Sequence, residues 1–291
     1  MTYAFFLGCN TPARLPQYER STRAVLGRLG VGLIDYREFT CCGYPLRNVD
    51  QKAFLLSAAG NMAIAERDGH DMLVLCKCGF GTFKEAQHRL DSDNTLRQEI
   101  NDLLQRQGLS YQGRVQVKHL LSVLYHDVGL DRLKKSITFK PKGLKIAVHY
   151  GCHALRPSRI TQFDDPVAPS LFDDLVRATG AESVDWYEKL NCCGAPLLGI
   201  DDRISMDLAR KKIQSGRDAG ADYLCTACPY CQLQFDQIQE RLMSDRTLEN
   251  SLPPILYSQL LGMCMGIDEA DLGLALNHIK NDGIRSFLKQ E

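Results

Sequence analysis

The 291-residue sequence lacks any stretch of about 20 uninterrupted apolar residues, the length that a membrane-spanning helix needs. It also lacks an excess of either charge, because 35 lysines and arginines stand against 35 aspartates and glutamates. Nucleic acids and anionic membranes bind basic surfaces, so we expect neither as a partner. The first residues, Met1 to Cys9, carry no basic segment and are too short for a signal peptide. We therefore expect a cytoplasmic protein in a reducing compartment.

Two kinds of redox motif are also missing. The sequence has no Gly-x-Gly-x-x-Gly fingerprint for a nucleotide cofactor and no Cys-x-x-Cys-x-x-Cys run of the ferredoxin type. Twelve cysteines are nevertheless present. In a reducing compartment, cysteines in this number indicate metal binding or redox chemistry rather than structural disulfides.

The cysteines recur in two matching sets, one in each half of the chain. Residues 41–46, Cys-Cys-Gly-Tyr-Pro-Leu, return at 192–197 as Cys-Cys-Gly-Ala-Pro-Leu, identical at five of six positions. A single cysteine precedes each copy, Cys9 in the first half and Cys152 in the second. This recurrence indicates an internal duplication. Further cysteines follow each copy: Cys76 and Cys78 in the first half, and Cys225, Cys228 and Cys231 in the second.

Short apolar runs alternate with segments of helical periodicity, which is typical of α/β units with mostly parallel sheets. We place a domain boundary near residue 143, within a linker at 136–144, and so expect duplicated domains at 1–143 and 144–291. Four segments are predicted as helices: 20–29, 53–66, 169–179 and 204–217. Three further segments are predicted as a polar helical arm at 82–107, an amphipathic segment at 117–128 and one or two closing helices after residue 252.

The cysteines of each set fall where predicted strands end, and ligands of parallel sheets collect at that edge. Thiolates are soft ligands that select zinc, copper(I) or iron–sulfur clusters. Structural zinc needs four ligands, whereas the second set has five and contains an adjacent pair that suits a multi-iron cluster better. We therefore expect an iron–sulfur cluster there and keep a zinc-stapled scaffold as an alternative. The second set is Cys152, Cys192, Cys193, Cys228 and Cys231.

With these motifs the chain resembles the cysteine-rich Cys-Cys-Gly domain family, and in particular the B subunit of heterodisulfide reductase, of the bacterial heterodisulfide reductase-like type. The resemblance extends over nearly the whole chain. It is carried by both Cys-Cys-Gly-x-Pro-Leu turns and by residues 117–124, 149–153, 228–231 and 259–262.

The resemblance implies two duplicated Cys-Cys-Gly domains related by a pseudo-twofold axis. Each set of five cysteines would hold a noncubane [4Fe-4S] cluster, with substrate sulfur bound between the two clusters. It implies an oxidoreductase that acts on a disulfide, a thiol or a protein-bound sulfur group. Electrons would arrive singly from an iron–sulfur subunit and a flavoprotein subunit of the same complex. The alternative is an electron-transfer subunit of a succinate, fumarate, glycolate or lactate oxidoreductase.

The first set departs from the family pattern at one position. When Cys76 is matched with Cys228, Gly79 stands against Cys231, and the second cysteine of the motif is Cys78, one position early. The N-terminal cluster could be noncubane with shifted ligation, a cubane [4Fe-4S] or a [3Fe-4S] cluster. We expect Cys78 to reach it. The candidate ligands of this site are Cys9, Cys41, Cys42, Cys76 and Cys78.

Other residues near the motifs have less specific roles. His153 follows a candidate ligand and could assist by giving a proton to a leaving thiolate or a hydrogen bond to cluster sulfur. The alternative is a structural role near the loop. We interpret His119 and His149 as structural histidines, Cys264 as a buried thiol, and Cys225 as a buried thiol or, alternatively, a reactive or spare ligand thiol. Lys77, Arg156 and Lys189 lie near candidate ligands, and we interpret them as solvated surface cations, with the alternative that they offset cluster charge or bind an anionic substrate.

Overall fold

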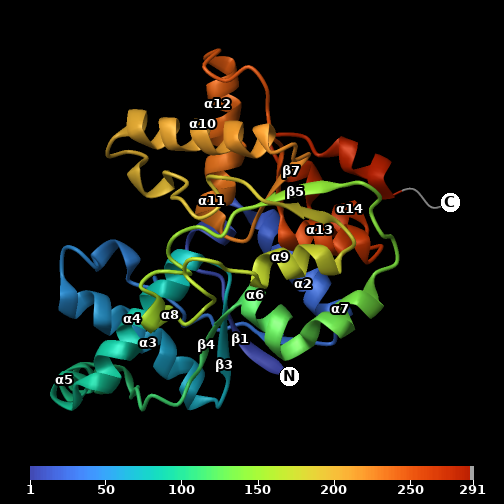
Figure 1. The fold of residues 1–291 in the computed structure, drawn as a ribbon. Coiled ribbons are helices and arrows are strands. Elements are labelled where there is room, and N and C mark those ends of the chain that lie inside the picture. The colour runs from blue at the N-terminus through green and yellow to red at the C-terminus, as the bar shows by residue number, and fades with distance from the viewer. Residues whose placement is uncertain (289–291) are drawn as a thin grey trace.

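The computed structural model describes residues 1–288 and contains two four-stranded sheets of the same design (Figure 1). The strands are β1 (Thr2–Phe6), β2 (Gly32–Ile34), β3 (Asp71–Val74), β4 (Val117–His119), β5 (Lys145–Val148), β6 (Glu182–Val184), β7 (Tyr223–Thr226) and β8 (Pro254–Leu256). The strand order is β2-β1-β3-β4 in one sheet and β6-β5-β7-β8 in the other, and every pairing is parallel. The prediction of a duplicated α/β fold is therefore confirmed.

Helices connect the strands in the same order in both halves. The first half contains α1 (Asn10–Arg14), α2 (Pro16–Arg28), η1 (Tyr44–Leu46), α3 (Gln51–Arg67), α4 (Lys77–Ser92), α5 (Asn94–Leu104), η2 (Gln105–Gln107), α6 (Leu120–Ser122), η3 (Val123–Gly129) and α7 (Leu130–Ser136). The second contains α8 (Ser158–Thr161), α9 (Leu171–Ala178), η4 (Ala195–Leu197), α10 (Asp202–Asp218), α11 (Pro229–Leu233), η5 (Gln234–Ile238), α12 (Gln239–Ser244), α13 (Tyr257–Cys264), α14 (Glu269–Leu272), η6 (Leu274–Leu276) and η7 (Asp282–Leu288). The four predicted helices correspond to α2, α3, α9 and α10 and are confirmed.

Matching caps begin the helices that follow the two Cys-Cys-Gly turns. The Asp50 carboxylate accepts hydrogen bonds from the backbone N–H groups of Lys52 and Ala53 at the start of α3. The Asp201 carboxylate accepts one from the N–H of Ile204 at the start of α10. An aspartate at this position satisfies backbone donors that the helix leaves free. Both helices therefore begin a few residues after the cysteine pair in each half.

Each half packs a helix against helices of the other half across the pseudo-twofold axis. Helix α2 of the first half packs against α13 and α14 of the second, and α9 of the second packs against α7 of the first (Figure 1). One apolar core extends through both halves and includes Phe5 from β1 and Tyr257 from α13. Residues 137–144 form no helix or strand, so the linker prediction agrees with the structure. The domain boundary at residue 143 stays a prediction, because this shared core crosses it.

Three segments differ from their predicted roles. Residues 82–107 are wrong as a polar arm, because α4 and α5 bury Phe83, Leu90 and Ile100 and pack against α3. The segment predicted at 117–128 begins as strand β4, and the tail begins with strand β8 before its helices. Both missed strands have only three residues, too few to show a period in the sequence.

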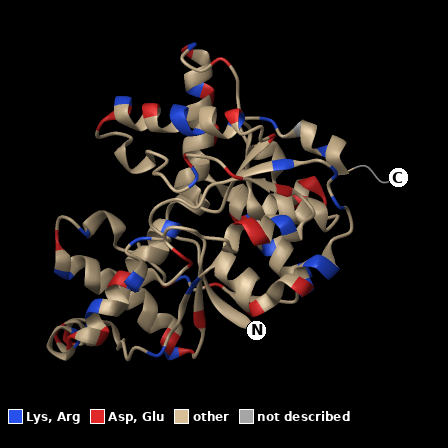
Figure 2. Cartoon of the chain, viewed as in Figure 1, with Lys and Arg blue, Asp and Glu red and all other residues tan. Residues whose placement is uncertain are grey.

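Lysines and arginines are interspersed with aspartates and glutamates on the helices of both halves (Figure 2). No helix within residues 1–288 combines the length and the apolar character that crossing a membrane requires.

Candidate metal centres

The candidate ligands follow the carboxyl ends of the central strands and of one neighbouring strand in each sheet. Cys9 follows β1, the Cys41–Cys42 pair follows β2 and Cys76 follows β3. In the second half the same order places Cys152 after β5, the Cys192–Cys193 pair after β6 and Cys228 after β7. Because the strands of each sheet are parallel, these loops meet at one edge of the sheet. The predicted placement at strand ends is confirmed. All twelve cysteines are free thiols.

A glycine makes each cysteine pair turn sharply against the following helix. Gly43 has φ of 87° and Gly194 has φ of 88°, a backbone region that glycine adopts at little cost. A Cβ at Gly43 would lie 2.8 Å from the Phe54 carbonyl oxygen, and one at Gly194 would lie 2.5 Å from that of Ser205. The Gly43 N–H also donates to Cys41 Sγ at 3.4 Å. The repeated motif therefore needs glycine for both its conformation and its close contact with the helix.

The N-terminal cavity is lined by all five candidate ligands of the first set. Besides these thiols its wall is apolar or neutral, with Asn10 and Tyr44 from the first half and Pro229 and Tyr230 from the second. Hydrogen bonding to the neighbouring Cys42 thiol lowers the pKa of Cys41 to about 6. The ligands that line this cavity are Cys9, Cys41, Cys42, Cys76 and Cys78.

The C-terminal cavity is lined by four of the five candidate ligands of the second set, together with Lys77, Cys78 and His153. The fifth, Cys192, directly precedes Cys193, and hydrogen bonding to the thiols of Cys152 and Cys193 lowers its pKa. The structure therefore brings all five residues of this set together. The four that line the cavity are Cys152, Cys193, Cys228 and Cys231.

The two cavities are adjacent, and Cys78 and Tyr230 line both of them. Between the cavities, the sulfur atoms of Cys76, Cys78 and Cys228 lie within 4.8 Å of one another. The third cysteine motifs of the two halves therefore meet. Tyr230 was not predicted as a site residue, although it lies between Cys228 and Cys231 in the sequence.

The one-position shift of Cys78 places it on the wall that the two cavities share. Successive residues of an α-helix differ by about 100° around its axis, and Cys78 lies in the first turn of α4. A Cβ at Gly79 would face the first site, 3.6 Å from Cys76 Cβ and 3.9 Å from Cys42 Cβ. Cys78 Sγ instead lies 3.3 Å from His153 Nδ1 of the second half. Ligation of the N-terminal cluster by Cys78 stays a prediction.

His153 lies between thiols of the two halves. Its Nδ1 is 3.3 Å from Cys78 Sγ and 3.6 Å from Cys152 Sγ, and its ring meets the edge of the Tyr44 ring. Burial lowers the pKa of this histidine. The predicted assisting residue is therefore within reach of both cavities.

His119 is a structural histidine, as predicted. It is fully buried, and its Nε2 lies 3.2 Å from the Leu75 carbonyl oxygen and 3.1 Å from that of Ala227. Its Nδ1 accepts a hydrogen bond from the N–H of Leu121. Burial lowers its pKa to about 3, so the ring is neutral and carries its proton on Nε2. This single N–H group therefore bridges Leu75, which precedes Cys76, and Ala227, which precedes Cys228.

The prediction that His149 is a satisfied structural histidine is wrong. The residue is fully buried, and neither of its ring nitrogens has a hydrogen-bond partner. A ring nitrogen lies within 4.8 Å of the sulfur atoms of both Cys193 and Cys231. Leaving a buried polar group unpaired is costly. The unpaired ring nitrogens of His149 are therefore consistent with a metal group bound by these thiols.

The three predicted surface cations differ in their surroundings. Arg156 is exposed, as predicted. Lys77 is only 2% exposed, so the prediction is wrong for it, because α4 directs its side chain between the two halves. Lys189 is also wrong as a solvated residue, since its ammonium pairs with the buried carboxylate of Asp173 at 2.8 Å. Cys225 and Cys264 are both fully buried, as predicted.

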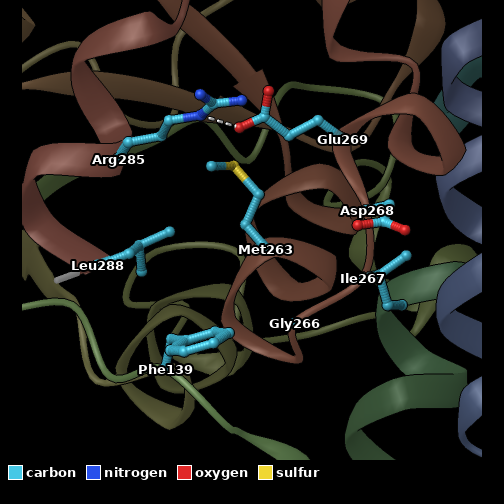
Figure 3. A pocket seen from close by; sticks show the side chains of 8 residues that line it. All are labelled: Phe139, Met263, Gly266, Ile267, Asp268, Glu269, Arg285 and Leu288. Atoms are coloured by element: carbon cyan, nitrogen blue, oxygen red, sulfur yellow. Dashed lines mark hydrogen bonds and ion pairs between the residues drawn. The ribbon is translucent and has the colours of Figure 1, made fainter. Parts of the chain in front are cut away.

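A separate hollow of about 430 Å³ lies between the linker and the C-terminal helices (Figure 3). An ion pair between Glu269 and Arg285 crosses its wall, and Phe139 and Met263 supply apolar surface. It is lined by one thioether and no thiol. The hollow is therefore distinct from the cysteine cavities.

Comparison with known proteins identifies the same duplicated unit. The family model described as cysteine-rich domain, CCG, matches residues 3–84 and again 146–236. The chain is 36% identical to the B subunit of the Ferredoxin/F(420)H(2)-dependent CoB-CoM heterodisulfide reductase of Methanosarcina acetivorans, over 96% of this chain and 94% of the relative. It is 33% identical to a protein of Archaeoglobus profundus described as similar to the heterodisulfide reductase B subunit, over 91% of each chain.

Two other similarities extend the comparison. The 8-methylmenaquinol:fumarate reductase membrane anchor subunit of Wolinella succinogenes is 32% identical, over 95% of this chain and 96% of the relative. A solved structure of a hypothetical protein from Helicobacter pylori has the same fold, with a TM-score of 0.73 and 18% identity over 96% of this chain and 52% of the other. The repeated motifs, the duplicated sheets and these matches agree: the chain belongs to the cysteine-rich domain family and is a homologue of the heterodisulfide reductase B subunit.

Proposed function

We propose that this chain is the iron–sulfur B subunit of a heterodisulfide reductase-like complex and carries out disulfide and thiol redox chemistry at two clusters. One observation carries the proposal. Nine thiols line two adjacent cavities that share Cys78 and Tyr230 as a common wall, and a tenth, that of Cys192, interacts with two of them. A sulfur substrate at that wall would be within reach of both sites.

The donor chemistry fits iron–sulfur clusters. Both cavities are lined by several thiols and by no carboxylate, which disfavours magnesium or calcium. A single zinc ion would use four ligands, fewer than each half offers. Clusters bound here would supply one-electron redox steps. We expect a noncubane [4Fe-4S] cluster on the second set, whereas the first set, with Gly79 at a ligand position, suits a [4Fe-4S] or a [3Fe-4S] cluster.

The residues around the cavities supply protons and orientation. Reduction of a disulfide consumes two electrons and two protons and releases two thiols. His153, with Nδ1 near the thiols of Cys78 and Cys152, is placed to give a proton to a leaving thiolate at the shared wall. Tyr230 and Tyr44 narrow the same space. The electrons would come from an iron–sulfur subunit and a flavoprotein subunit, and the substrate would be a disulfide, a thiol or a protein-bound sulfur group.

A second candidate is a subunit that only relays electrons. The fumarate reductase relative favours it, because a chain 32% identical serves there as an anchor subunit. The two candidates differ in one measurement. Added thiol or disulfide should perturb the cluster's electron paramagnetic resonance spectrum if sulfur chemistry occurs here, and should leave it unchanged in a pure relay.

Metal analysis of anaerobically purified protein tests the assignment. We expect iron and sulfide in amounts that correspond to two clusters, with little zinc. Cys193→Ser and Cys231→Ser should each lower the iron content by one cluster and remove only the C-terminal signal. Cys264→Ala is the matched control, because this buried thiol lines neither cavity. Zinc as the main metal, or unchanged iron in both variants, would refute the proposal.

A further inference from the structure

Two lysines are fully buried among the residues that the structure describes, and neither has a carboxylate within ion-pair distance there. Lys77 Nζ donates to the carbonyl oxygens of His149 and Tyr150 at 3.0 and 2.7 Å. Lys212 Nζ donates to the Glu188 carbonyl oxygen. Burying an ammonium without a compensating anion is strongly unfavourable. The surroundings of these two side chains therefore favour a negative charge close to them.

Both lysines lie near thiols of the C-terminal site. Lys77 lines it, and a Cβ at Gly151 would lie 3.6 Å from Lys77 Cδ and 3.8 Å from Cys231 Sγ. Lys212 comes from α10, and the thiols of Cys193 and Cys231, together with the Glu188 carboxylate, interact with it electrostatically. A cluster held by cysteine thiolates would carry net negative charge and would compensate both ammonium groups.

At the position that the internal repeat relates to Lys212, the N-terminal half carries no such charge. Lys212 follows Cys193 by 19 residues, and Asn61 follows Cys42 by the same number. Asn61 is buried like Lys212 but is neutral, and its amide is fully used by the Thr40 N–H and the carbonyl oxygens of Cys41 and Ser57.

The residue after the first cysteine of the third motif shows the same difference. Lys77 follows Cys76 and lines the C-terminal cavity, whereas Pro229 follows Cys228 and lines the N-terminal cavity. Each half therefore places its first helical residue against the site of the other half. The residue that lines the C-terminal site is therefore the cation Lys77, whereas the one that lines the N-terminal site is Pro229.

The third difference lies three residues before the first cysteine of each set. His149 precedes Cys152 there, and Phe6 precedes Cys9. The unpartnered nitrogens of His149 lie beside the thiols of the C-terminal site, and Phe6 can donate no hydrogen bond in the N-terminal one. At three repeat-related positions, the residue near the C-terminal site is thus a cation or has an unpaired ring nitrogen, whereas its counterpart is a neutral residue with no unpaired polar group.

We propose that Lys77, Lys212 and His149 hold the C-terminal site at a higher reduction potential than the N-terminal site. This inference rests on the proposed function, in which both sites hold clusters. Reduction makes a cluster more negative, and buried cations and hydrogen bonds to its sulfurs stabilise the reduced form. Single electrons that enter from the partner iron–sulfur subunit would therefore collect at the C-terminal site.

Redox titration followed by electron paramagnetic resonance tests the proposal. Lys77→Met, Lys212→Asn and His149→Phe should each lower the midpoint potential of the C-terminal signal and leave the N-terminal signal in place. Lys212→Arg keeps the charge and should keep the potential close to that of the unmodified protein. Lys118→Met is the matched control, because this lysine is already paired with Asp127. The C-terminal signal is identified by its loss in Cys193→Ser.

The unmodified protein provides a second measurement that requires no variant. Its C-terminal signal should titrate at the higher potential. The proposal is overturned if the N-terminal signal titrates higher, or if both clusters are loaded and the lysine variants keep the native potential. Iron content separates this failure from failure of the proposed function, since protein without clusters would refute both.

Discussion

At the scale of single residues, one thiol distinguishes the ligand sets of the two sites. Cys78 stands one position before the place where the repeat requires a ligand, and its sulfur contacts His153 of the other half. It also lies within 4.8 Å of the sulfurs of Cys76 and Cys228. From this position, Cys78 can bind a cluster in the N-terminal site only from the wall that this site shares with the C-terminal site.

We expect Cys78→Ala to alter the spectrum of the N-terminal cluster and to weaken turnover with sulfur substrates. The reason is that Cys78 is the thiol nearest in sequence to the missing ligand at Gly79. Electron paramagnetic resonance and iron content measure the effect. Cys225→Ala is the control, a buried thiol that lines neither cavity. If Cys78→Ala keeps both native spectra and full activity, the site rests on Cys9, Cys41, Cys42 and Cys76 alone.

At the scale of the elements, the turn between each cysteine pair and its helix determines where the ligands lie. Gly194 and Gly43 have the same left-handed backbone conformation and the same close approach to the helix that follows. Asp201 and Asp50 then cap those helices. The cysteine pair is therefore held by backbone geometry on its C-terminal side as well as by the strand before it.

Gly194→Ala should destabilise the protein by about 2–4 kcal/mol, because the new Cβ would meet the Ser205 carbonyl oxygen and the backbone conformation is strained for alanine. Urea unfolding measures the loss, and the iron content should fall at the C-terminal site. Gly199→Ala is a matched control, since Gly199 has φ of 86° but open space around it. It should cost only about 1 kcal/mol. Equal effects of the two substitutions would show that the contact with α10 is unimportant.

At the scale of the whole molecule, the two halves contact each other at the start of the loops that carry their third cysteine motifs. His119 at the end of β4 contacts the carbonyl oxygens of Leu75 and Ala227, which precede the third cysteine motifs of both halves. Around this contact, α2 and α9 pack on helices of the opposite half. The relative position of the two cavities is therefore part of the folded core.

Replacing His119 with Phe should affect both sites together. The substitution removes the N–H shared by two buried carbonyl oxygens and the acceptor of the Leu121 N–H, so we expect a loss of about 2–3 kcal/mol in the free energy of unfolding. Both cluster signals should broaden or decrease in the same variant. His126→Gln, at an exposed position, should change stability by less than about 0.5 kcal/mol. A change confined to one cluster would contradict this bridging role.

The sequence predicted the architecture well where the signals are local. The repeated Cys-Cys-Gly-x-Pro-Leu segment, the helices at 53–66 and 204–217 and the cysteines at strand ends all follow from residue type and spacing. Strands β4 and β8 were missed because three residues carry no period. Residues 82–107 were misjudged because their apolar residues are sparse, although α4 and α5 bury them against α3.

The sequence by itself determined which chemistry this protein can hold, because thiol type, pairing and repetition are properties of the chain. The tertiary structure alone decided where the residues that distinguish the two sites lie. The direction of Cys78 depends on the phase of α4, which a one-residue shift rotates by about 100°. The burial of Lys77 and the orphaned nitrogens of His149 arise only where the halves pack together. Such contacts join residues far apart in the chain, and no local pattern encodes them.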